Sequence, residues 1–163
     1  MNKIHAVFLD RDGVINKKRN DYVKSWEEFI FLDGVDEALK LFSNHGYKII
    51  IITNQSAINR KIITVENLNL IHENMKNSFH QKGIIIDAIF FCPHKPDDGC
   101  NCRKPKTGMI EKALQNFDLL PQNCVLIGDS DIDIEAGNTM GITSYLLEKQ
   151  SLLEVSKIIT GTK

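Results

Sequence analysis

The segment AVFLDRDG, residues 6–13, places two aspartates one residue apart at the end of a short apolar run. A later apolar run leads in the same way into GDSDID, residues 128–133. Carboxylates at strand ends favour Mg²⁺, a hard cation that prefers oxygen ligands and often binds substrate phosphate as well. Aspartate is also a good helix cap, which explains either segment taken alone. The two segments together favour phosphoryl-transfer chemistry.

Elsewhere in the chain, apolar runs alternate with amphipathic stretches. The apolar runs predict strands at 4–9, 48–52, 84–91, 123–127 and 142–147. Apolar residues at helical spacing predict helices that begin near 35, 64 and 107, with Thr64 and Thr107 as caps, and a shorter helix at 131–140. The repeated strand–helix units predict an α/β fold, a doubly wound, Rossmann-like parallel sheet with helices on both faces.

Four polar or reactive residues directly follow a predicted strand: Asp10, Thr53, Cys92 and Asp129. In an open parallel sheet these positions lie together along the carboxyl edge, where ligands bind. Two further segments, 14–33 and 92–107, fit no regular element, and loops of this size in a compact domain are usually functional. We therefore expect one crevice at this edge, with segment 14–33 able to cover it.

The overall composition argues against several classes of protein. The 163 residues carry a formal net charge of −1, so no global field attracts nucleic acid or a membrane. No apolar run approaches the roughly 20 residues that span a bilayer, and no signal-peptide apolar region precedes the first strand. We expect one domain over residues 1–163, and a cytoplasmic monomer whose partner is a small phosphorylated molecule rather than nucleic acid or membrane.

The first aspartate pair suggests a covalent mechanism. Asp10 can attack phosphorus and form an aspartyl-phosphate, which divides one difficult displacement into two easier ones. Asp12 is close enough to protonate the leaving alkoxide and then to deprotonate the attacking water. Gly13 leaves room for a phosphate beside the backbone. Arg11 alternates away from this site, and we expect it to be solvated or packed against the sheet.

Two other polar segments can contact a phosphoryl group. TNQS, residues 53–56, offers a hydroxyl, amides and backbone N–H groups to developing negative charge, although taken alone it also fits an ordinary polar turn. Lys104 can neutralise a phosphate, and Arg103 beside it can bind a second oxyanion through two donors. Without such partners, adjacent cations in a loop are usually just solvated.

A cysteine and histidine cluster indicates a metal site. Three thiols and one imidazole fall within eleven residues: Cys92, His94, Cys100 and Cys102. This set completes a closed tetrahedral Zn²⁺ site of the structural kind, and the alternative is a group of free thiols. Zinc would fold loop 92–102, which has little structure of its own, and hold the adjacent cations in place. Cys124 fits a small buried apolar residue, and we expect surface or satisfied core positions for His5, His45, His72 and His80.

The ordered set of motifs resembles the haloacid dehalogenase superfamily of phosphohydrolases. The matching motifs are DRDGV at 10–14, TNQS at 53–56, RKPKTGM at 103–109 and GDSDID at 128–133. The resemblance implies a Mg²⁺-dependent phosphoaspartate mechanism. Asp10 would be nucleophile and metal ligand, Asp12 would be general acid/base and bind the metal through its carbonyl, and Asp129 would complete the metal site. Thr53 and Lys104 would hold the phosphoryl group, and Asp133 would support the metal ligands from behind.

The cysteine loop resembles the subgroup without a large cap domain that acts on heptose bisphosphates or, in near relatives, histidinol phosphate. The substrate-binding residues that this implies are Asn54, Gln55, Ser56, Arg103, Ser130, Arg19, Asn20, Asp21 and Tyr22. A bisphosphate suits the Arg103–Lys104 pair, whereas histidinol phosphate would need acidic side chains such as Asp21, Glu27 or Glu28. The chain departs from the usual pattern at 57–61, AINRK, where that subgroup carries glycines and an Arg-Gly pair.

An alternative of another class is a non-catalytic scaffold that senses phosphate. A site that no longer catalyses a reaction has no physical need to keep five functional residues intact, namely Asp10, Asp12, Thr53, Lys104 and Asp129. A receiver-type signalling domain would lack the second aspartate and the cysteine loop. The sequence therefore favours an enzyme, a phosphoric monoester hydrolase.

Overall fold

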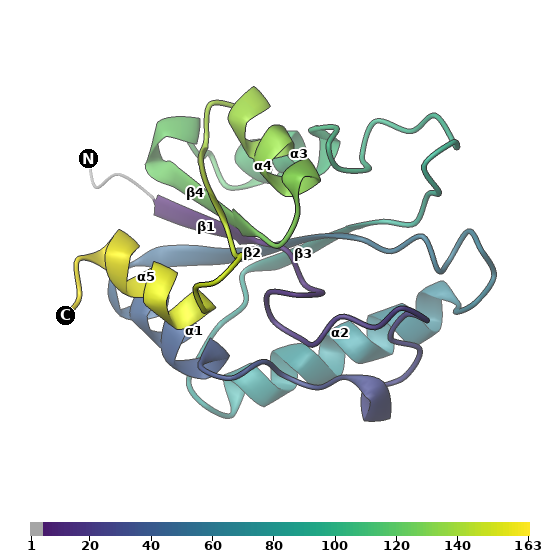
Figure 1. Cartoon of the computed structure of the whole chain (residues 1–163), viewed down its shortest axis with the longest axis horizontal. Coiled ribbons are helices and arrows are strands. Elements are labelled where there is room, and N and C mark those ends of the chain that lie inside the picture. The colour runs from purple at the N-terminus through teal and green to yellow at the C-terminus, as the bar shows by residue number, and fades with distance from the viewer. Residues whose placement is uncertain (1–4) are drawn as a thin grey trace.

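The computed structural model describes residues 5–163, which form a five-stranded parallel sheet with helices on both faces (Figure 1). The strands are β1 (His5–Leu9), β2 (Tyr47–Asn54), β3 (Ala88–Cys92), β4 (Cys124–Gly128) and β5 (Thr143–Leu146), in the order β3-β2-β1-β4-β5. The helices are α1 (Val35–Asn44), α2 (Val65–His80), α3 (Gly108–Asn116), α4 (Asp131–Thr139) and α5 (Leu152–Thr160), with 3₁₀ turns η1 (Trp26–Glu28) and η2 (Pro121–Asn123). None of the helices described is long and apolar enough to cross a membrane. The predicted doubly wound α/β fold is confirmed.

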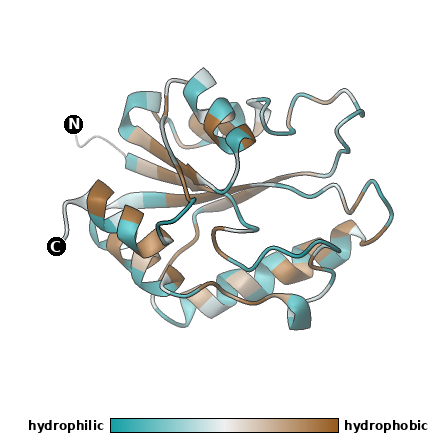
Figure 2. Cartoon of the chain, viewed as in Figure 1, coloured by the Kyte–Doolittle hydropathy of each residue, from teal (hydrophilic) through white to brown (hydrophobic). Residues whose placement is uncertain are grey.

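Both faces of the sheet are buried, which explains the consecutive isoleucines of β2. Ile49 and Ile51 pack with α1, α2 and α5, whereas Ile50 and Ile52 pack with α3 and α4 on the opposite face. Figure 1 shows these two helical layers, and Figure 2 shows the apolar strands between them. A strand covered on both faces has no solvent side, so it carries a continuous apolar run rather than an alternating one.

Several predicted boundaries differ from the structure. The strand predicted at 84–91 begins only at Ala88. The residues before it form no strand, and they place Ile84 and Ile86 in the core while Ile85 is 65% exposed. β2 extends through Asn54, and Cys92 ends β3, so Thr53 and Cys92 lie within strands rather than after them. Residue 4, where the first strand was predicted to begin, lies outside the described residues.

Side-chain caps begin some of the predicted helices and one helix that was missed. The Thr64 hydroxyl accepts a hydrogen bond from the backbone N–H of Asn67 at 3.1 Å, as its position predicted. Thr107 precedes α3 but its hydroxyl caps no backbone N–H and contacts Glu111 instead, so that predicted cap is wrong. No helix was predicted at α5, although Ser151 and Glu154 form a capping box there.

Candidate active site

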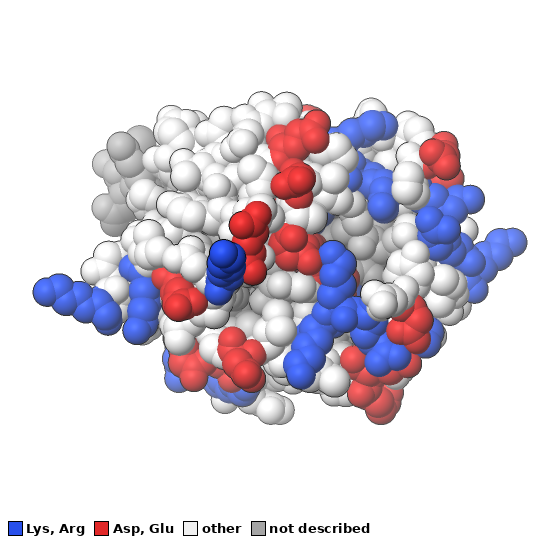
Figure 3. Space-filling view, viewed as in Figure 1, with Lys and Arg blue, Asp and Glu red and all other residues white. Residues whose placement is uncertain are grey.

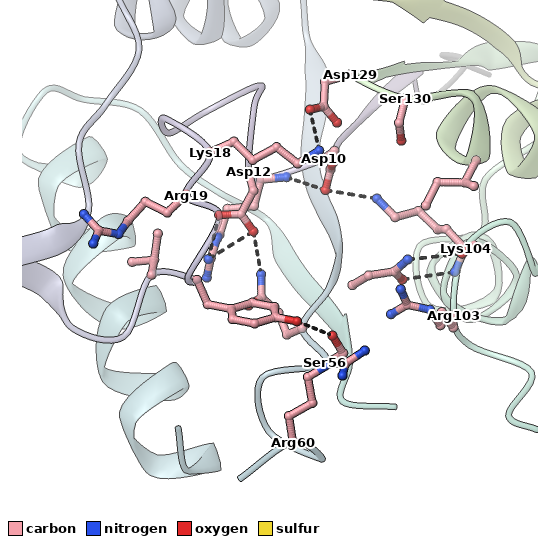
Figure 4. A pocket seen from close by; sticks show the side chains of 16 residues that line it. Asp10, Asp12, Lys18, Arg19, Ser56, Arg60, Arg103, Lys104, Asp129 and Ser130 are labelled. Carbon is pink, nitrogen blue, oxygen red and sulfur yellow. Dashed lines mark hydrogen bonds and ion pairs between the residues drawn. The ribbon is translucent and has the colours of Figure 1, made fainter. Parts of the chain in front are cut away.

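The carboxyl ends of the strands meet at one cavity of about 270 Å³, as predicted (Figure 4). Its lining includes eleven of the predicted site residues: Asp10, Asp12, Arg19, Tyr22, Asn54, Gln55, Ser56, Arg103, Lys104, Asp129 and Ser130. Three others, Asn20, Asp21 and Thr53, do not line it. The parallel sheet therefore brings together residues that are more than one hundred positions apart.

Asp10 and Lys104 form a buried ion pair at the bottom of this cavity. The Lys104 Nζ lies 3.0 Å from Asp10 Oδ1, which also accepts the backbone N–H of Arg11 at 2.8 Å. Burial raises the pKa of Asp10 to about 7, and Lys104 opposes this rise only in part. The carboxylate is poorly solvated, so a cation or a positive phosphorus centre is a favourable partner for it.

Lys104 is itself fixed from several directions. Only 2% of its side chain is exposed, and Nζ donates to Asp133 Oδ1 at 2.6 Å and to the carbonyl of Ile52 at 2.8 Å. Burial opposes its charge, but Asp10 and Asp133 outweigh that effect and raise the pKa of Lys104. The ammonium therefore stays charged and stationary, ready to contact a phosphoryl oxygen.

Asn54 positions Lys104 from the neighbouring strand. Its Oδ1 accepts the backbone N–H of Lys104 at 3.0 Å, and its Nδ2 donates to the carbonyl of the same residue at 3.1 Å. Both polar groups of the amide contact the backbone of segment 92–107, which differs from the direct substrate contact predicted for Asn54. The side chain still lines the cavity.

The Asp12 carboxylate has donors on several sides. Arg11 Nη2 donates to its two oxygens at 2.9 and 3.1 Å, and Asn16 Nδ2 and Gln55 Nε2 each donate at 2.9 Å. Burial raises the pKa of Asp12, but Arg11, Asn16 and Gln55 together hold it below its usual value. The carboxylate is thus oriented, and it is ionised, as a general base needs to be.

Arg11 is 1% exposed, so of its two predicted alternatives the structure excludes the solvated side chain and agrees with the packed one. The alternation of side chains ends with β1, and the backbone turns sharply, since the Arg11 carbonyl accepts N–H groups from Val14, Ile15 and Asn16. This turn directs the guanidinium beneath segment 14–33. There Nη1 lies 3.1 Å from Nε2 of His72, which occupies the buried core position that was one of its two predicted alternatives.

Thr53 lies behind the cavity wall. It is fully buried, and its hydroxyl accepts a hydrogen bond from Gln55 Nε2 at 2.8 Å. The same Gln55 amide nitrogen contacts Asp12. Thr53 is thus connected to the acid/base group through Gln55.

Three carboxylates lie close enough to share a cation. Asp10, Asp129 and Asp133 each offer an oxygen within 4.8 Å of the others. The Oδ1 of Asp129 is buried and has no hydrogen-bond partner among residues 5–163. A buried carboxylate oxygen without a partner is costly unless a ligand satisfies it. The donor set is all oxygen, so it fits a hard divalent cation.

The Asp12 carboxylate is not part of this group of three. Its oxygens already bind Arg11, Asn16 and Gln55. This arrangement agrees with the implication of the resemblance that Asp12 contributes its carbonyl rather than its carboxylate. Asp133 pairs with Lys104, in keeping with the supporting position expected for it.

Gly13 allows the Asp129 carboxylate to approach the first loop. Its φ of +87° lies in the left-handed region, and a Cβ there would stand 2.2 Å from Asp129 Oδ2. Any side chain would therefore displace Asp129 as well as strain the backbone. The glycine that was predicted to make room for a phosphate makes room for this carboxylate.

A rim of four basic side chains surrounds the mouth of the cavity: Lys18, Arg19, Arg60 and Arg103. Figure 3 shows basic and acidic side chains side by side on this face of the molecule. Lys18, which is 60% exposed, donates to Asp129 Oδ2 at 2.9 Å. Lys18 and Arg60 were not among the predicted site residues. The charge run at 17–19 and the position of Arg60 just after TNQS were the available signals.

Of the predicted residues 19–22, Arg19 and Tyr22 line the cavity, whereas Asn20 and Asp21 do not. Arg19 pairs with Asp21 at 3.0 Å and with Glu28 at 3.7 Å, which draws Asp21 away from the cavity. The phenol oxygen of Tyr22 lies 3.5 Å from Ser56 Oγ, so those two side chains meet across the cavity wall. Ser130 lines the opposite side and donates from its hydroxyl to Asp133 at 3.0 Å.

The predicted metal-binding loop brings its four side chains together. One donor atom from each of Cys92, His94, Cys100 and Cys102 lies within 4.8 Å of the others, and all three cysteines are free thiols. His94 presents Nδ1, at 3.4 Å from Cys92 Sγ and 3.3 Å from Cys102 Sγ. Burial raises the pKa of Cys100, but backbone N–H groups outweigh it and lower that pKa to about 7. These features fit a thiophilic cation in a tetrahedral site.

This cluster also supports the rim. Nη1 of Arg103 donates to the carbonyl of His94 at 3.1 Å. The arginine is thus anchored to the loop that the cluster closes, as predicted. Cys124 lies elsewhere, buried in β4, and its thiol contacts the carbonyl of Leu120 at 3.3 Å, which confirms a core position.

Comparison with known proteins relates the chain to phosphatases. The HAD-hydrolase-like family model matches residues 101–151. A D-glycero-beta-D-manno-heptose-1,7-bisphosphate 7-phosphatase of Neisseria meningitidis is 44% identical over 83% of this chain and 72% of its own. The enzyme of the same name from Helicobacter pylori is 38% identical over 94% of this chain and 89% of its own. A relative from Photorhabdus laumondii, named for the alpha anomer, is 41% identical over 91% and 84%.

Solved structures support the same relationship. The D,D-heptose 1,7-bisphosphate phosphatase from B. bronchiseptica, complexed with magnesium and phosphate, superposes with a TM-score of 0.91. It is 31% identical in sequence and covers 98% of this chain and 100% of its own.

Proposed function

Because this chain belongs to the heptose-1,7-bisphosphate 7-phosphatase family of haloacid dehalogenase-like hydrolases, we propose that it removes the 7-phosphate of D-glycero-D-manno-heptose 1,7-bisphosphate. One observation carries the proposal. A buried nucleophile and an oriented acid/base, Asp10 and Asp12, share a cavity with a rim of four cations. A substrate with a phosphate at each end can place one on the aspartates and the other on the rim.

Asp10 performs the first displacement. Its Oδ1 accepts contacts from Arg11 N–H and Lys104, while Oδ2 accepts no hydrogen bond among the described residues and can attack phosphorus. A bond forms between Asp10 and phosphorus as the bond to the sugar oxygen breaks. Asp12 is ionised in the free site, so it first takes up a proton from solvent or from the phosphate monoanion, and then passes that proton to the departing alkoxide. Lys104 stabilises the charge on the transferred group.

Asp12 also serves the second displacement. Having given up its proton, it is the base that takes one from a water molecule in the place of the departed sugar. The water oxygen attacks phosphorus, the bond to Asp10 breaks, and inorganic phosphate leaves with Asp10 restored. Asn16, Gln55 and Arg11 hold the Asp12 carboxylate between the two steps.

We infer that Mg²⁺ is the cation for Asp10, Asp129 and the carbonyl of Asp12, with Asp133 behind them. When bound, it would neutralise negative charge on the carboxylates and the phosphoryl oxygens. The unpartnered Asp129 Oδ1 supports this assignment. Lys18 provides a positive charge to the other oxygen of the same carboxylate.

We infer that Zn²⁺ is the structural cation of Cys92, His94, Cys100 and Cys102. Three thiolates and an imidazole fill a tetrahedral shell and leave no position for substrate. Changing Cys100→Ser should lower the zinc content and the melting temperature, and raise KM through the anchored Arg103. Metal analysis, thermal melts and kinetics check this; full zinc content with an unchanged melting temperature would contradict it.

The acidic side chains that histidinol phosphate would need are not placed for it. Asp21 and Glu28 pair with Arg19 and Lys24, and neither they nor Glu27 line the cavity. A cationic amine would instead meet the basic rim, which repels it. The bisphosphate is therefore the better match for this cavity.

We further infer that residues 1–163 act as a single phosphatase domain, monomeric because one chain supplies every group in the proposed mechanism. A cytoplasmic location is consistent with four free thiols, three of them in a proposed zinc site, since a reducing compartment keeps such thiols available.

The test is phosphate release with Mg²⁺ from each anomer of the heptose bisphosphate and from histidinol phosphate at matched concentrations. We expect kcat/KM at least about tenfold higher for a bisphosphate, equivalent to one rim contact with an anion. A preference for histidinol phosphate would contradict the proposed substrate. Tight binding without any release would indicate the non-catalytic scaffold instead.

A further inference from the structure

A chain of buried polar side chains connects the acid/base group to a helix that lies outside the cavity. Arg11 Nη2 donates to both oxygens of Asp12, while its Nη1 lies 3.1 Å from Nε2 of His72 on α2. Arg11 and His72 are both buried. His72 does not line the cavity, and among residues 5–163 its side-chain hydrogen bond to a cavity residue is the one to Arg11.

The orientation of the Arg11 guanidinium depends on few contacts. Its Nε is buried without a hydrogen-bond partner among residues 5–163, so the two Nη groups make all its side-chain hydrogen bonds there. The ring of Phe29 lies 5.7 Å from Cζ and packs against the guanidinium. Packing against the Phe29 ring limits the tilt of the guanidinium plane, but it does not fix how the guanidinium is turned within that plane. His72 is the fixed point that selects this rotation.

The chemistry of the pair determines the state of His72. Arginine can only donate, so Nε2 of His72 accepts and the imidazole proton lies on Nδ1. Burial and the charge of Arg11 lower the pKa of His72 to about 3, which keeps the ring neutral. A neutral acceptor fixes the guanidinium without competing for its charge. A carboxylate at this position would share the charge that Arg11 presents to Asp12.

We propose that His72 is a positioning residue for the phosphatase reaction: it orients Arg11, which in turn aims the Asp12 carboxylate at the leaving group and the attacking water. The inference rests on the proposed function, since it requires Asp12 as acid and base. It assigns a role in the reaction to a residue of α2, a helix that covers one face of the sheet and whose His72 does not line the cavity.

Three variants test this role. His72→Leu removes the acceptor, His72→Gln keeps an acceptor at a similar reach, and Met75→Ala disturbs the same buried face of α2 without touching the chain of polar groups. We expect His72→Leu to lower kcat about tenfold with KM within about twofold, as expected for partial loss of acid/base catalysis. His72→Gln should recover most of that loss. Met75→Ala should lose thermal stability but keep kcat.

The kinetic result overturns the proposal if His72→Leu retains the wild-type kcat, or if Met75→Ala loses as much kcat as His72→Leu. A wild-type protein that hydrolyses none of the phosphates would instead contradict the proposed function. A second readout, independent of turnover, separates the two cases. The carboxyl ¹³C signal of Asp12 should shift in His72→Leu and stay in place in His72→Gln and Met75→Ala. An unchanged Asp12 signal in His72→Leu would overturn the positioning role.

Discussion

The bottom of the cavity and its rim are built differently. At the bottom, Asp10, Asp12, Lys104 and Asp129 lie at strand ends or are tied to them, and each makes at least one short contact with a neighbour. The rim residues come from three loops, and Lys18 and Arg60 are exposed. Fixed groups suit bond making and breaking, which tolerate little misplacement. Cations at an open rim suit the capture of an anion.

This difference predicts that changes at the bottom abolish chemistry or stability, whereas changes at the rim alter only substrate binding.

Replacing Asp10 by asparagine should lower kcat by more than about a thousandfold, because the amide cannot act as the nucleophile. The fold should survive, since Lys104 keeps its contacts with Asp133 and the Ile52 carbonyl. Phosphate-release assays measure the loss of kcat, and thermal melts show whether the fold survives. A variant with near wild-type turnover would rule out Asp10 as the nucleophile.

Replacing Lys104 by methionine should destabilise the protein by about 3–5 kcal/mol, because it leaves buried carboxylates without their cation. The matched control is Lys48→Met, which removes a half-exposed pair with Asp87 and should cost no more than about 1 kcal/mol. Urea unfolding of both variants measures the difference. An equal loss of unfolding free energy in the two variants would mean that the ion pair at the bottom of the cavity stabilises the fold no more than a surface pair does.

Gly13→Ala should weaken the binding of Mg²⁺, because the new Cβ would displace the Asp129 carboxylate. Gly46→Ala is the control, since Gly46 has a similar φ of +76° but no atom within 4 Å of an added Cβ. Both variants should lose about 1 kcal/mol of stability through backbone strain. Titration calorimetry with Mg²⁺ should separate them. Unchanged affinity in Gly13→Ala would show that Asp129 is not a ligand.

Arg60→Ala should raise KM for the bisphosphate about three- to tenfold and leave kcat within about twofold, as expected for one solvated contact with an anion. Lys61→Ala is the control, because its exposed side chain does not line the cavity. Added salt should reduce the difference in KM between Arg60→Ala and the wild type, because it screens this exposed contact. A fall in kcat instead would place Arg60 with the catalytic groups and remove the contrast between bottom and rim.

The bottom of the site was predictable from sequence because a parallel sheet aligns its strand ends. That rule alone brought Asp10 and Asp129 to one edge, and the spacing of the cysteines and His94 was enough to predict their cluster. The five strands were also placed, although β3 was predicted to begin four residues early. Ile84 and Ile86, before β3, are apolar because they lie in the core, and not because they pair in the sheet.

The rest depended on contacts that local patterns do not encode. The alternation rule failed for Arg11, because the chain turns immediately after β1 and buries the side chain against His72. Arg60 belongs to the rim only because its loop folds toward segment 14–33. The helix α5 was within reach of prediction, since the capping box of Ser151 and Glu154 was visible in the sequence.

The most direct test of the whole account is to trap the covalent intermediate on Asp10. Protein quenched in acid during turnover is reduced with borohydride, which converts an aspartyl-phosphate into homoserine, and the chain is mapped by mass spectrometry. We expect homoserine at position 10 in the wild type and none in Asp10→Asn. Homoserine at another aspartate would contradict the role assigned to Asp10, and so would an Asp10→Asn variant that still yields the trapped product.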